Sequence, residues 1–253
     1  MKIAVCIKQV PTREWQPRLN DQKTWVREQD VSYEMNEPDA YALEEALRLR
    51  EKHSGEVVVC SAGPARVQSV VREALARGAD RAIHVEDDRL GAADASVVAG
   101  ALAAAMRDEQ FDLVLTGLQS DDQGHGQTGV ILAEGLGMVS STIIMEVQVE
   151  GGSLRVKREL EGGWFQWIGM PLPALLTIQS GINQLRYATL KGIMAAKKKE
   201  IRKVPLPDGL QPSQQIVGLA VPTRSKQTRM IGGSPADAAR ELVRCLREDA
   251  RAL

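Results

Sequence analysis

Short apolar runs alternate with helical periods through the first two-thirds of the chain. Runs rich in β-branched residues predict four strands, at 3–7, 56–61, 81–85 and 112–116. Helices are predicted at 39–52 and 94–106, each opening on an aspartate suited to capping, and around 67–75, where apolar residues recur on one face. Strands that alternate with helices in this way form a parallel sheet with helices on both faces.

The pattern changes after residue 141. Residues 142–149 and 154–159 flank a Glu-Gly-Gly-Ser turn and predict a β-hairpin, and strand character continues at 164–168 and 175–178. A helical period covers 186–199, and a last amphipathic helix follows Ser234 and Pro235. Residues 202–232 have no period and predict an extended arm. We therefore expect an α/β domain over 1–200 and an arm with a helix over 201–253 that packs on a partner chain.

Composition narrows the class of protein. The 253 residues are 43% hydrophobic and carry a formal net charge of -1, so no basic field favours nucleic acid. The three cysteines, Cys6, Cys60 and Cys245, are too scattered for a disulfide framework or a zinc site, and we expect the first two to be buried thiols. The sequence contains no apolar run of membrane-spanning length and no signal-peptide pattern. We expect a cytoplasmic protein.

The segment with the clearest binding chemistry runs from Gly117 to Gly129, after the fourth strand and before an apolar helix over 130–136. Its glycines permit close backbone approach, and the N-terminus of a helix offers amide donors to anions. In open α/β sheets ligands bind beyond the carboxyl ends of the strands, where this segment is expected to lie. It favours a phosphate near Gly126, Gln127 and Thr128; the alternative is a plain glycine-rich connection, because neither the Rossmann fingerprint nor a P-loop is present.

Candidate catalytic groups are few. Asp121 and Asp122 are adjacent in the glycine-rich segment, but loop aspartates usually turn chains or cap helices. The three histidines, at 53, 84 and 125, are isolated, and no Ser-His-Asp or Cys-His arrangement can be argued from their positions. We therefore expect no metal site and no catalytic residues: the sequence favours a binding protein over an enzyme.

Several segments together resemble the electron-transfer flavoprotein beta subunit, over about residues 1–200. They are Val5-Cys6-Ile7-Lys8-Gln9-Val10-Pro11; Met35-Asn36-Glu37-Pro38-Asp39 followed by Ala42-Leu43-Glu44-Glu45-Ala46; Val156-Lys157-Arg158-Glu159-Leu160-Glu161-Gly162-Gly163; and Arg186-Tyr187-Ala188-Thr189-Leu190 with Ile193-Met194 and Lys197-Lys198-Lys199. The last of these is the most specific. The resemblance implies a three-layer adenine-nucleotide hydrolase-like (universal-stress-like) fold with a hairpin insertion.

The resemblance also implies a heterodimer in which an alpha subunit carries the redox-active FAD and this chain carries AMP. It assigns the nucleotide to Cys6, Asn36, Glu37, Pro38, Asp39, Ala62, Gly117, Gln119, Asp122, Gly124, Gly126, Gln127 and Thr128. It places Leu190 where the family anchors flavin dehydrogenases, within a partner-binding set that includes Arg186, Tyr187, Ile193 and Met194, and it places Glu159 opposite the mobile FAD domain. The chain is then a non-catalytic electron-carrier subunit.

Departures from the family pattern leave two alternatives open. Glu37-Pro38 and the Asp121–Gly126 stretch differ from the usual residues, and Gly91-Ala92-Ala93-Asp94 resembles the Gly-Gly-Ala-Asp of the electron-bifurcating branch. In that branch a second FAD replaces AMP and NADH reduces the protein. The other alternative is a stand-alone nucleotide sensor of the universal-stress type, which would not need the arm and terminal helix.

Overall fold

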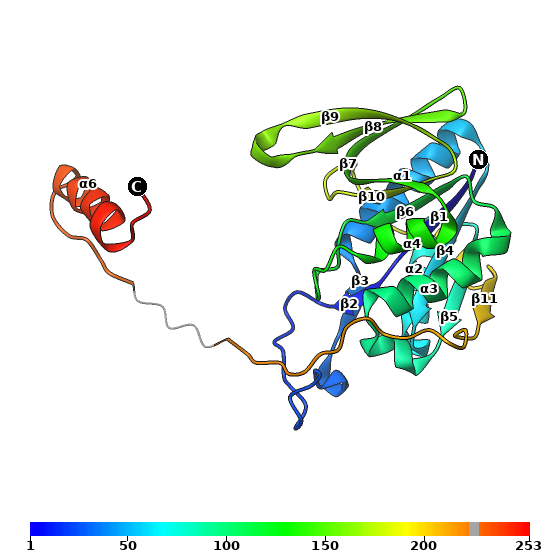
Figure 1. Ribbon diagram of the computed structural model, residues 1–253, viewed down its shortest axis with the longest axis horizontal. Coiled ribbons are helices and arrows are strands. Elements are labelled where there is room, and N and C mark those ends of the chain that lie inside the picture. Colours follow the sequence, from blue (N-terminus) through cyan, green and yellow to red (C-terminus); the bar gives the residue numbers. More distant parts are fainter. Residues whose placement is uncertain (223–227) are drawn as a thin grey trace. The chain divides into compact units, whose positions relative to one another are not determined.

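A nine-stranded sheet forms the centre of the first of two compact units, Met1–Leu219 and Ala220–Leu253 (Figure 1). The computed structural model describes residues 1–222 and 228–253. The strand order is β11-β5-β4-β1-β6-β10-β7-β8-β9. The strands are β1 (Lys2–Cys6), β4 (Glu56–Gly63), β5 (Arg81–Glu86), β6 (Leu113–Gly117), β7 (Val139–Glu150), β8 (Ser153–Glu159), β9 (Phe165–Pro171), β10 (Ala174–Ile178) and β11 (Ile201–Val204), with a separate pair β2 (Gln9–Pro11) and β3 (Tyr33–Met35).

Parallel pairing dominates the sheet, as the alternation of strands and helices predicts. β1 lies between β4 and β6 and is parallel to both, so that Val5 pairs with Val59 on one side and with Leu115 on the other. β7, β8 and β9 are joined by antiparallel pairs and extend one edge of the sheet. The expected hairpin over 142–159 is therefore confirmed, with a third strand added to it.

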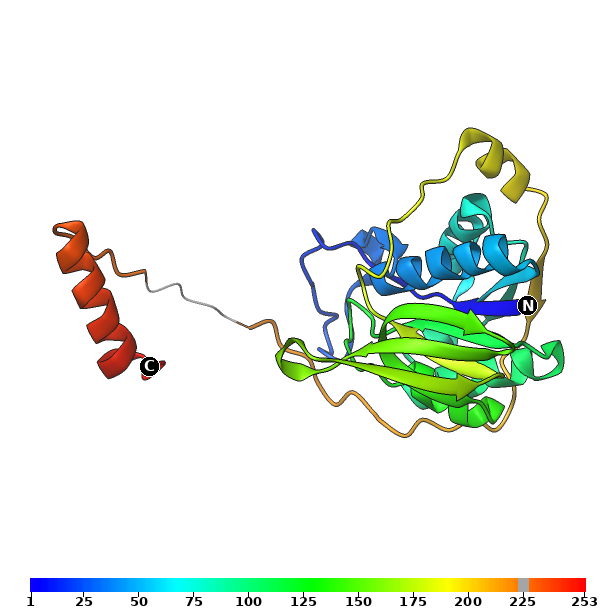
Figure 2. The same cartoon turned by 90° about the horizontal axis from the view of Figure 1, so that it is seen from above.

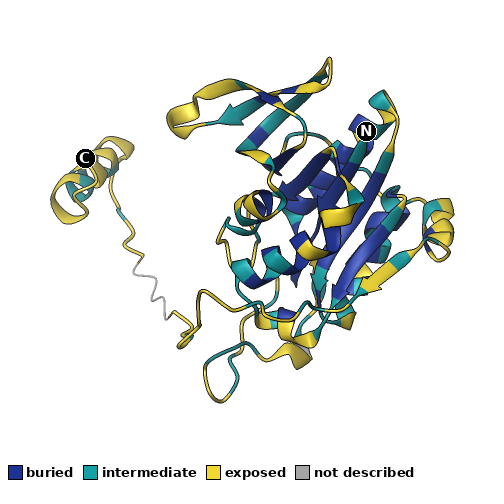
Figure 3. Cartoon of the chain, turned by 45° about the vertical axis from the view of Figure 1, so that its right-hand side comes forward, coloured by how far each residue is buried: buried dark blue, intermediate teal, exposed yellow. Residues whose placement is uncertain are grey.

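Helices cover both faces of the sheet (Figure 2). The α-helices are α1 (Glu37–His53), α2 (Gln68–Arg77), α3 (Ala95–Met106), α4 (Thr128–Leu136), α5 (Leu190–Ala196) and α6 (Pro235–Arg244). Side chains alternate along a strand, so Ile3 and Val5 of β1 pack with α1 and α2, while Ala4 and Cys6 pack with α3 and α4. Short 3₁₀ segments are η1 (Glu28–Asp30), η2 (Ala65–Val67), η3 (Asp88–Ala92), η4 (Arg107–Glu109) and η5 (Glu161–Gly163). The predicted three-layer α/β class is confirmed, and the buried residues concentrate in the central strands (Figure 3).

An ion cluster at the amino ends of the strands connects three of them. Glu109 accepts hydrogen bonds from Arg81 on β5 at 2.6 Å, Lys2 on β1 at 2.8 Å and Arg202 on β11 at 2.9 Å. The hydrogen bond from Arg81, with that from Lys2, lowers the pKa of Glu109 to about 2. The cluster fastens the edge strand β11 to the centre of the sheet.

Three segments differ from the sequence-based prediction. Helix α1 begins at Glu37, after Asn36, so Asp39 lies inside its first turn and is not its cap. The helix expected over 186–199 is only Leu190–Ala196, because Thr189 ends the preceding extended segment and caps α5 by accepting a hydrogen bond from the Gly192 amide at 3.0 Å. The segment predicted to be an aperiodic arm begins with β11, which pairs in parallel with β5. Residues 201–219 therefore lie in the first unit.

The second unit contains the final helix. Ser234 caps α6 by accepting a hydrogen bond from the Asp237 amide, and Pro235 occupies the first helical position, as the sequence indicates. A π-helical turn, η6 (Cys245–Asp249), continues it. None of the helices in the described part of the chain combines the length and apolar content that a membrane crossing requires.

Candidate functional site

A large cavity of the first unit lies beyond the carboxyl ends of β1, β4 and β6. Its volume is about 1140 Å³, and Cys6, Ala62, Thr116 and Gly117 from these strands form part of its wall. The chain places β4 and β5 on one side of β1 and β6 on the other, so the cavity lies at the switch point of the sheet. This is where open α/β sheets bind their ligands.

The glycine-rich segment forms one side of this cavity. Gly126, Gln127, Thr128 and Gly129 line it, and α4 begins at Thr128. The φ angle of Gly126 is 62°, a left-handed conformation that glycine adopts without strain. The first amides of an α-helix have no partner within the helix and carry its partial positive charge. The segment can therefore offer backbone donors and the Thr128 hydroxyl to an anion.

Two buried side chains of the α1 N-terminus hold this segment in place. Asp39 accepts hydrogen bonds from the amides of Lys8 at 2.7 Å and Gly117 at 2.8 Å. Asn36 donates to the carbonyl of Gln119 at 3.0 Å and accepts from the amide of Asp121 at 2.9 Å. A β-carbon at Gly117 would collide with the Asp39 carboxylate. The resemblance assigned Asn36 and Asp39 to the nucleotide, and both reach the cavity wall while they fix the loop that surrounds it.

Burial raises the pKa values of two side chains at the cavity wall, Asp39 and Cys6. It raises the pKa of Asp39 to about 7, against the amides of Lys8 and Gly117, which favour the charged carboxylate. Burial also raises the pKa of the Cys6 thiol well above its ordinary value, so Cys6 contributes a neutral, apolar wall. Both Cys6 and Cys60 are buried, as the sequence predicts.

Lys8 is a cavity residue that the sequence analysis did not select. Its ammonium group donates to the Asp122 carboxylate at 2.7 Å, to Gln123 at 3.1 Å and to Ser120 at 3.3 Å. Lys8 lies two residues after the end of β1, and a basic residue close to the carboxyl end of a strand is a signal that could have identified it. It places a cation beside the glycine-rich segment.

The arm closes another side of the cavity. This side is lined by Leu206, Leu210 and residues 212–216. They are far from the glycine-rich segment in sequence but line the same cavity. Asp94, which caps α3, accepts hydrogen bonds from the amides of Ser213 at 2.6 Å and Gln214 at 2.9 Å. Trp25 also contributes to the wall. Sequence reasoning missed the residues of the arm because the arm has no hydrophobic period from which its position could be predicted.

The thirteen nucleotide candidates divide into two groups by position. Those that line the cavity are Cys6, Asn36, Asp39, Ala62, Gly117, Gln119, Gly126, Gln127 and Thr128. The remaining four lie outside its lining: Glu37, Pro38, Asp122 and Gly124. Glu37 forms an ion pair with Arg13, and Asp122 is bonded to two residues that line the cavity, Lys8 and Gln123.

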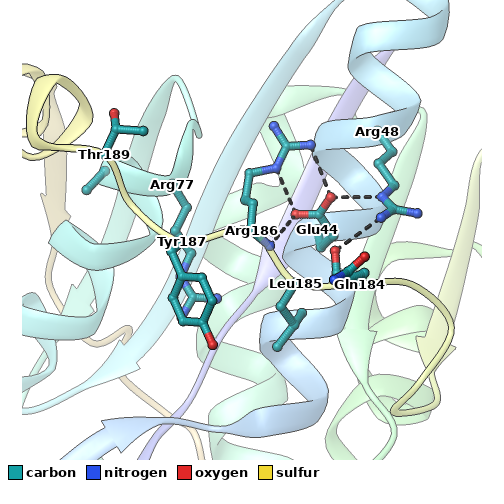
Figure 4. Close-up of a pocket in the computed structure, with 9 residues that line it drawn as sticks. Glu44, Arg48, Arg77, Gln184, Leu185, Arg186, Tyr187 and Thr189 are labelled. Atoms are coloured by element: carbon teal, nitrogen blue, oxygen red, sulfur yellow. Dashed lines mark hydrogen bonds and ion pairs between the residues drawn. The ribbon is translucent and has the colours of Figure 1, made fainter.

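A second candidate surface lies on the loop before α5 and on α5 itself. Its apolar side chains are exposed: Tyr187 is 88%, Leu190 83% and Met194 64% accessible, and Ile193 is half-exposed. A pocket of about 520 Å³ lies between this loop, α1 and α2 (Figure 4). Arg186 differs from its neighbours, because its guanidinium points toward Glu44 on α1. Glu159 lies elsewhere, at the end of β8, where Gln179 donates to it at 3.2 Å.

Known proteins match this chain along nearly its whole length. The model of the electron transfer flavoprotein domain matches residues 23–209. Electron transfer flavoprotein subunit beta of Methylophilus methylotrophus is 36% identical over 98% of this chain and 98% of its own. The proteins of that name from Homo sapiens (36% identical, 99% and 98% covered) and Bacillus subtilis (34%, 90% and 91%) match similarly. The chain belongs to the electron transfer flavoprotein family, among its beta subunits.

Proposed function

We propose that this chain is the beta subunit of a heterodimeric electron carrier and that it holds an adenine nucleotide in the cavity beyond β1, β4 and β6. The observation that carries the proposal is the position of the α4 N-terminus and the Gly117–Gly129 segment on the wall of a 1140 Å³ cavity at the sheet's switch point. FAD in the alpha subunit supplies the redox chemistry when it is bound. This chain binds the nucleotide, completes the heterodimer and presents a docking surface, which makes it a carrier subunit and not an enzyme.

AMP is the proposed ligand because the donors present suit a phosphate. The amides that open α4 and the Thr128 hydroxyl are donors, and the amides carry the partial positive charge of the helix N-terminus. The Lys8 ammonium lies on the same wall, paired with Asp122. The apolar wall beside Cys6 and Ala62 suits the flat face of a base. Phosphate at a helix N-terminus needs no side-chain cation in direct contact.

A second FAD is the alternative ligand, and one feature favours it. The cavity exceeds the roughly 300–1,000 Å³ that small-molecule sites usually occupy, and residues 91–94 of the bifurcating-type stretch line it. The absorbance spectrum of the purified heterodimer, with flavin and AMP quantified after acid extraction, separates the two. One flavin and one AMP per heterodimer support the proposal, whereas two flavins and no AMP establish the alternative.

A matched pair of variants tests the phosphate assignment. Thr128→Val keeps the shape of the side chain and removes its hydroxyl, while Thr142→Val makes the same change on β7. A hydrogen bond to a charged group is worth about 1.5–3 kcal/mol, so the dissociation constant for AMP should rise about 10- to 150-fold in the first variant. The second should bind as the unsubstituted protein does. Equal affinities in both variants would remove Thr128 from the phosphate site.

The surface around Leu190 is proposed to dock flavin dehydrogenases. Tyr187, Leu190 and Met194 form an apolar group that the first unit leaves exposed, which is typical of an interaction site. The alpha subunit is proposed to cover the second unit, since α6 carries apolar side chains, Leu242 and Val243 among them, that stay half-exposed. The two proposed surfaces belong to different units of the chain.

A further inference from the structure

The docking surface is connected to the body of the protein by a segment without regular secondary structure, residues 179–189, between β10 and α5. Such a segment loses a large conformational entropy when it is fixed by a partner. A loop that is already fixed before binding avoids that loss. The contacts that hold this segment therefore bear on how tightly it can dock.

Glu44 on α1 is the centre of those contacts (Figure 4). Its side chain is only 4% exposed, and its carboxylate accepts from Arg186 three times: from Nε at 2.8 Å, from Nη2 at 3.1 Å and from the backbone amide at 3.2 Å. Arg48 donates to the same carboxylate at 2.8 Å. Burial alone would raise the pKa of Glu44, but the hydrogen bonds from Arg186 and Arg48 bring it below its ordinary value. The carboxylate is charged and saturated with donors from the loop and from its own helix.

Glu51 is the second carboxylate that binds the Arg186 guanidinium. It lies two turns after Glu44 on the same side of α1 and accepts from the other edge of the guanidinium, at 2.5 Å from Nη1 and 3.2 Å from Nη2. The planar guanidinium of Arg186 thus bridges two carboxylates, a geometry that lysine cannot reproduce. Arg186 faces the protein and not a partner.

Two further contacts fix the preceding residues to the same helix. Asn183 donates to the carbonyl of Tyr41 at 3.1 Å and to Glu45 at 3.0 Å. Arg48 donates to the carbonyl of Gln184 at 3.1 Å. Helix α1 therefore holds the loop at 183, 184 and 186 in succession, directly before the exposed Tyr187.

The far end of the surface is held by α2. Arg72 donates to the carbonyl of Ala196, the last residue of α5, at 2.6 Å and to that of Lys199 at 2.8 Å. With α1 fixing the segment before Tyr187 and α2 fixing the end of α5, Leu190 lies between two anchored points. The inward side chain of Arg186 leaves Tyr187 directed to solvent (Figure 4).

We propose that Glu44 is a positioning residue for partner docking: through Arg186 it holds residues 183–187 in the conformation that presents Tyr187 and Leu190. The inference rests on the proposed docking function of that surface. It changes the role of Arg186 from a contact with the partner to a bridge between the loop and α1. Loss of the bridge lowers the fraction of molecules whose loop is competent to dock, and the apparent affinity falls in proportion.

The test uses the purified heterodimer with the variants Glu44→Gln, Glu51→Gln and Glu73→Gln. Glu73 is the matched control, because it pairs with Arg77 on the α2 side of the same pocket and has no bond to the loop. Glu51 is half-exposed, so its variant folds even if Glu44→Gln does not. The measurements are amide hydrogen exchange at 183–187 and the KM and kcat of a dehydrogenase with the heterodimer as acceptor.

We expect Glu44→Gln to speed amide exchange at 183–187 but not within α3. If the loop is competent to dock in about one tenth of the molecules, KM should rise about tenfold. Glu51→Gln should raise KM by about threefold. The kcat should be unchanged in both variants, and Glu73→Gln should change neither KM nor the exchange at 183–187. Unchanged exchange in the Glu44 and Glu51 variants overturns the positioning role. If exchange rises without a rise in KM, Leu190→Ala decides what has failed. A raised KM in Leu190→Ala then keeps the docking function and overturns the inference, whereas an unchanged KM overturns both.

Discussion

Leu190→Ala is the substitution that separates a docking residue from a core residue most directly. A buried Leu-to-Ala change costs about 2–5 kcal/mol of stability, but Leu190 is 83% exposed. The truncation should therefore alter the free energy of unfolding by less than about 0.5 kcal/mol. A leucine side chain that moves from water into a protein pocket contributes about 1.5–3 kcal/mol. Because most of Leu190 is available for burial and a β-carbon remains in the variant, we expect a loss of about 2 kcal/mol on docking, or about 30-fold in affinity.

The assay is the steady-state reduction of the heterodimer by a dehydrogenase at varied carrier concentration, with thermal unfolding and flavin content measured on the same sample. KM should rise about 30-fold while the melting temperature and flavin content stay the same. Leu160→Ala, at a leucine that is 39% exposed at the end of the hairpin, is the control and should leave KM unchanged. A lower melting temperature with an unchanged KM would refute the docking role of Leu190 and indicate that its side chain packs within the protein.

Three further outcomes follow from the structure. Gly117→Ala places a methyl group against the buried α1 carboxylate; overpacking of this kind costs about 1–3 kcal/mol, so the melting temperature and AMP content should fall, whereas Gly169→Ala, with open space around it, should change neither. Because the hydrogen bond from Arg81 lowers the pKa of Glu109 to about 2, the stability that this carboxylate contributes is present above about pH 4.5 and is lost as the pH falls toward 2; the melting-temperature advantage over Glu109→Gln should shrink accordingly between pH 5 and pH 3. Deletion of 220–253 should leave the first unit folded, as judged by circular dichroism and cooperative unfolding, but unable to co-purify with the alpha subunit; an intact heterodimer would assign the assembly contacts to the first unit.

The sequence by itself determined the elements whose signal is local. The apolar residues at 67–75, the capping aspartate at 94 and the Glu-Gly-Gly-Ser turn each predicted the element that forms there, namely α2, α3 and the hairpin. Periodicity and capping act over a few residues, so no tertiary information was needed to recognise them. The position of Gly117–Gly129 beyond a strand end also followed from the order of elements alone.

Contacts between distant segments were decided only by the tertiary structure. Asp39 accepts a hydrogen bond from the amide of Gly117, 78 residues away in sequence. The aperiodic arm at 206–216 lines the same cavity as the glycine-rich segment. Leu190 lies on an apolar helical stripe that could face inward or outward, and sequence pattern has no means to choose between the two. In the structure Tyr187 and Leu190 are exposed, whereas Arg186 is bound by the Glu44 carboxylate of α1, 142 residues away in sequence. The pairing partner of a charged side chain is set by folding in three dimensions, and one sequence carries no local trace of it.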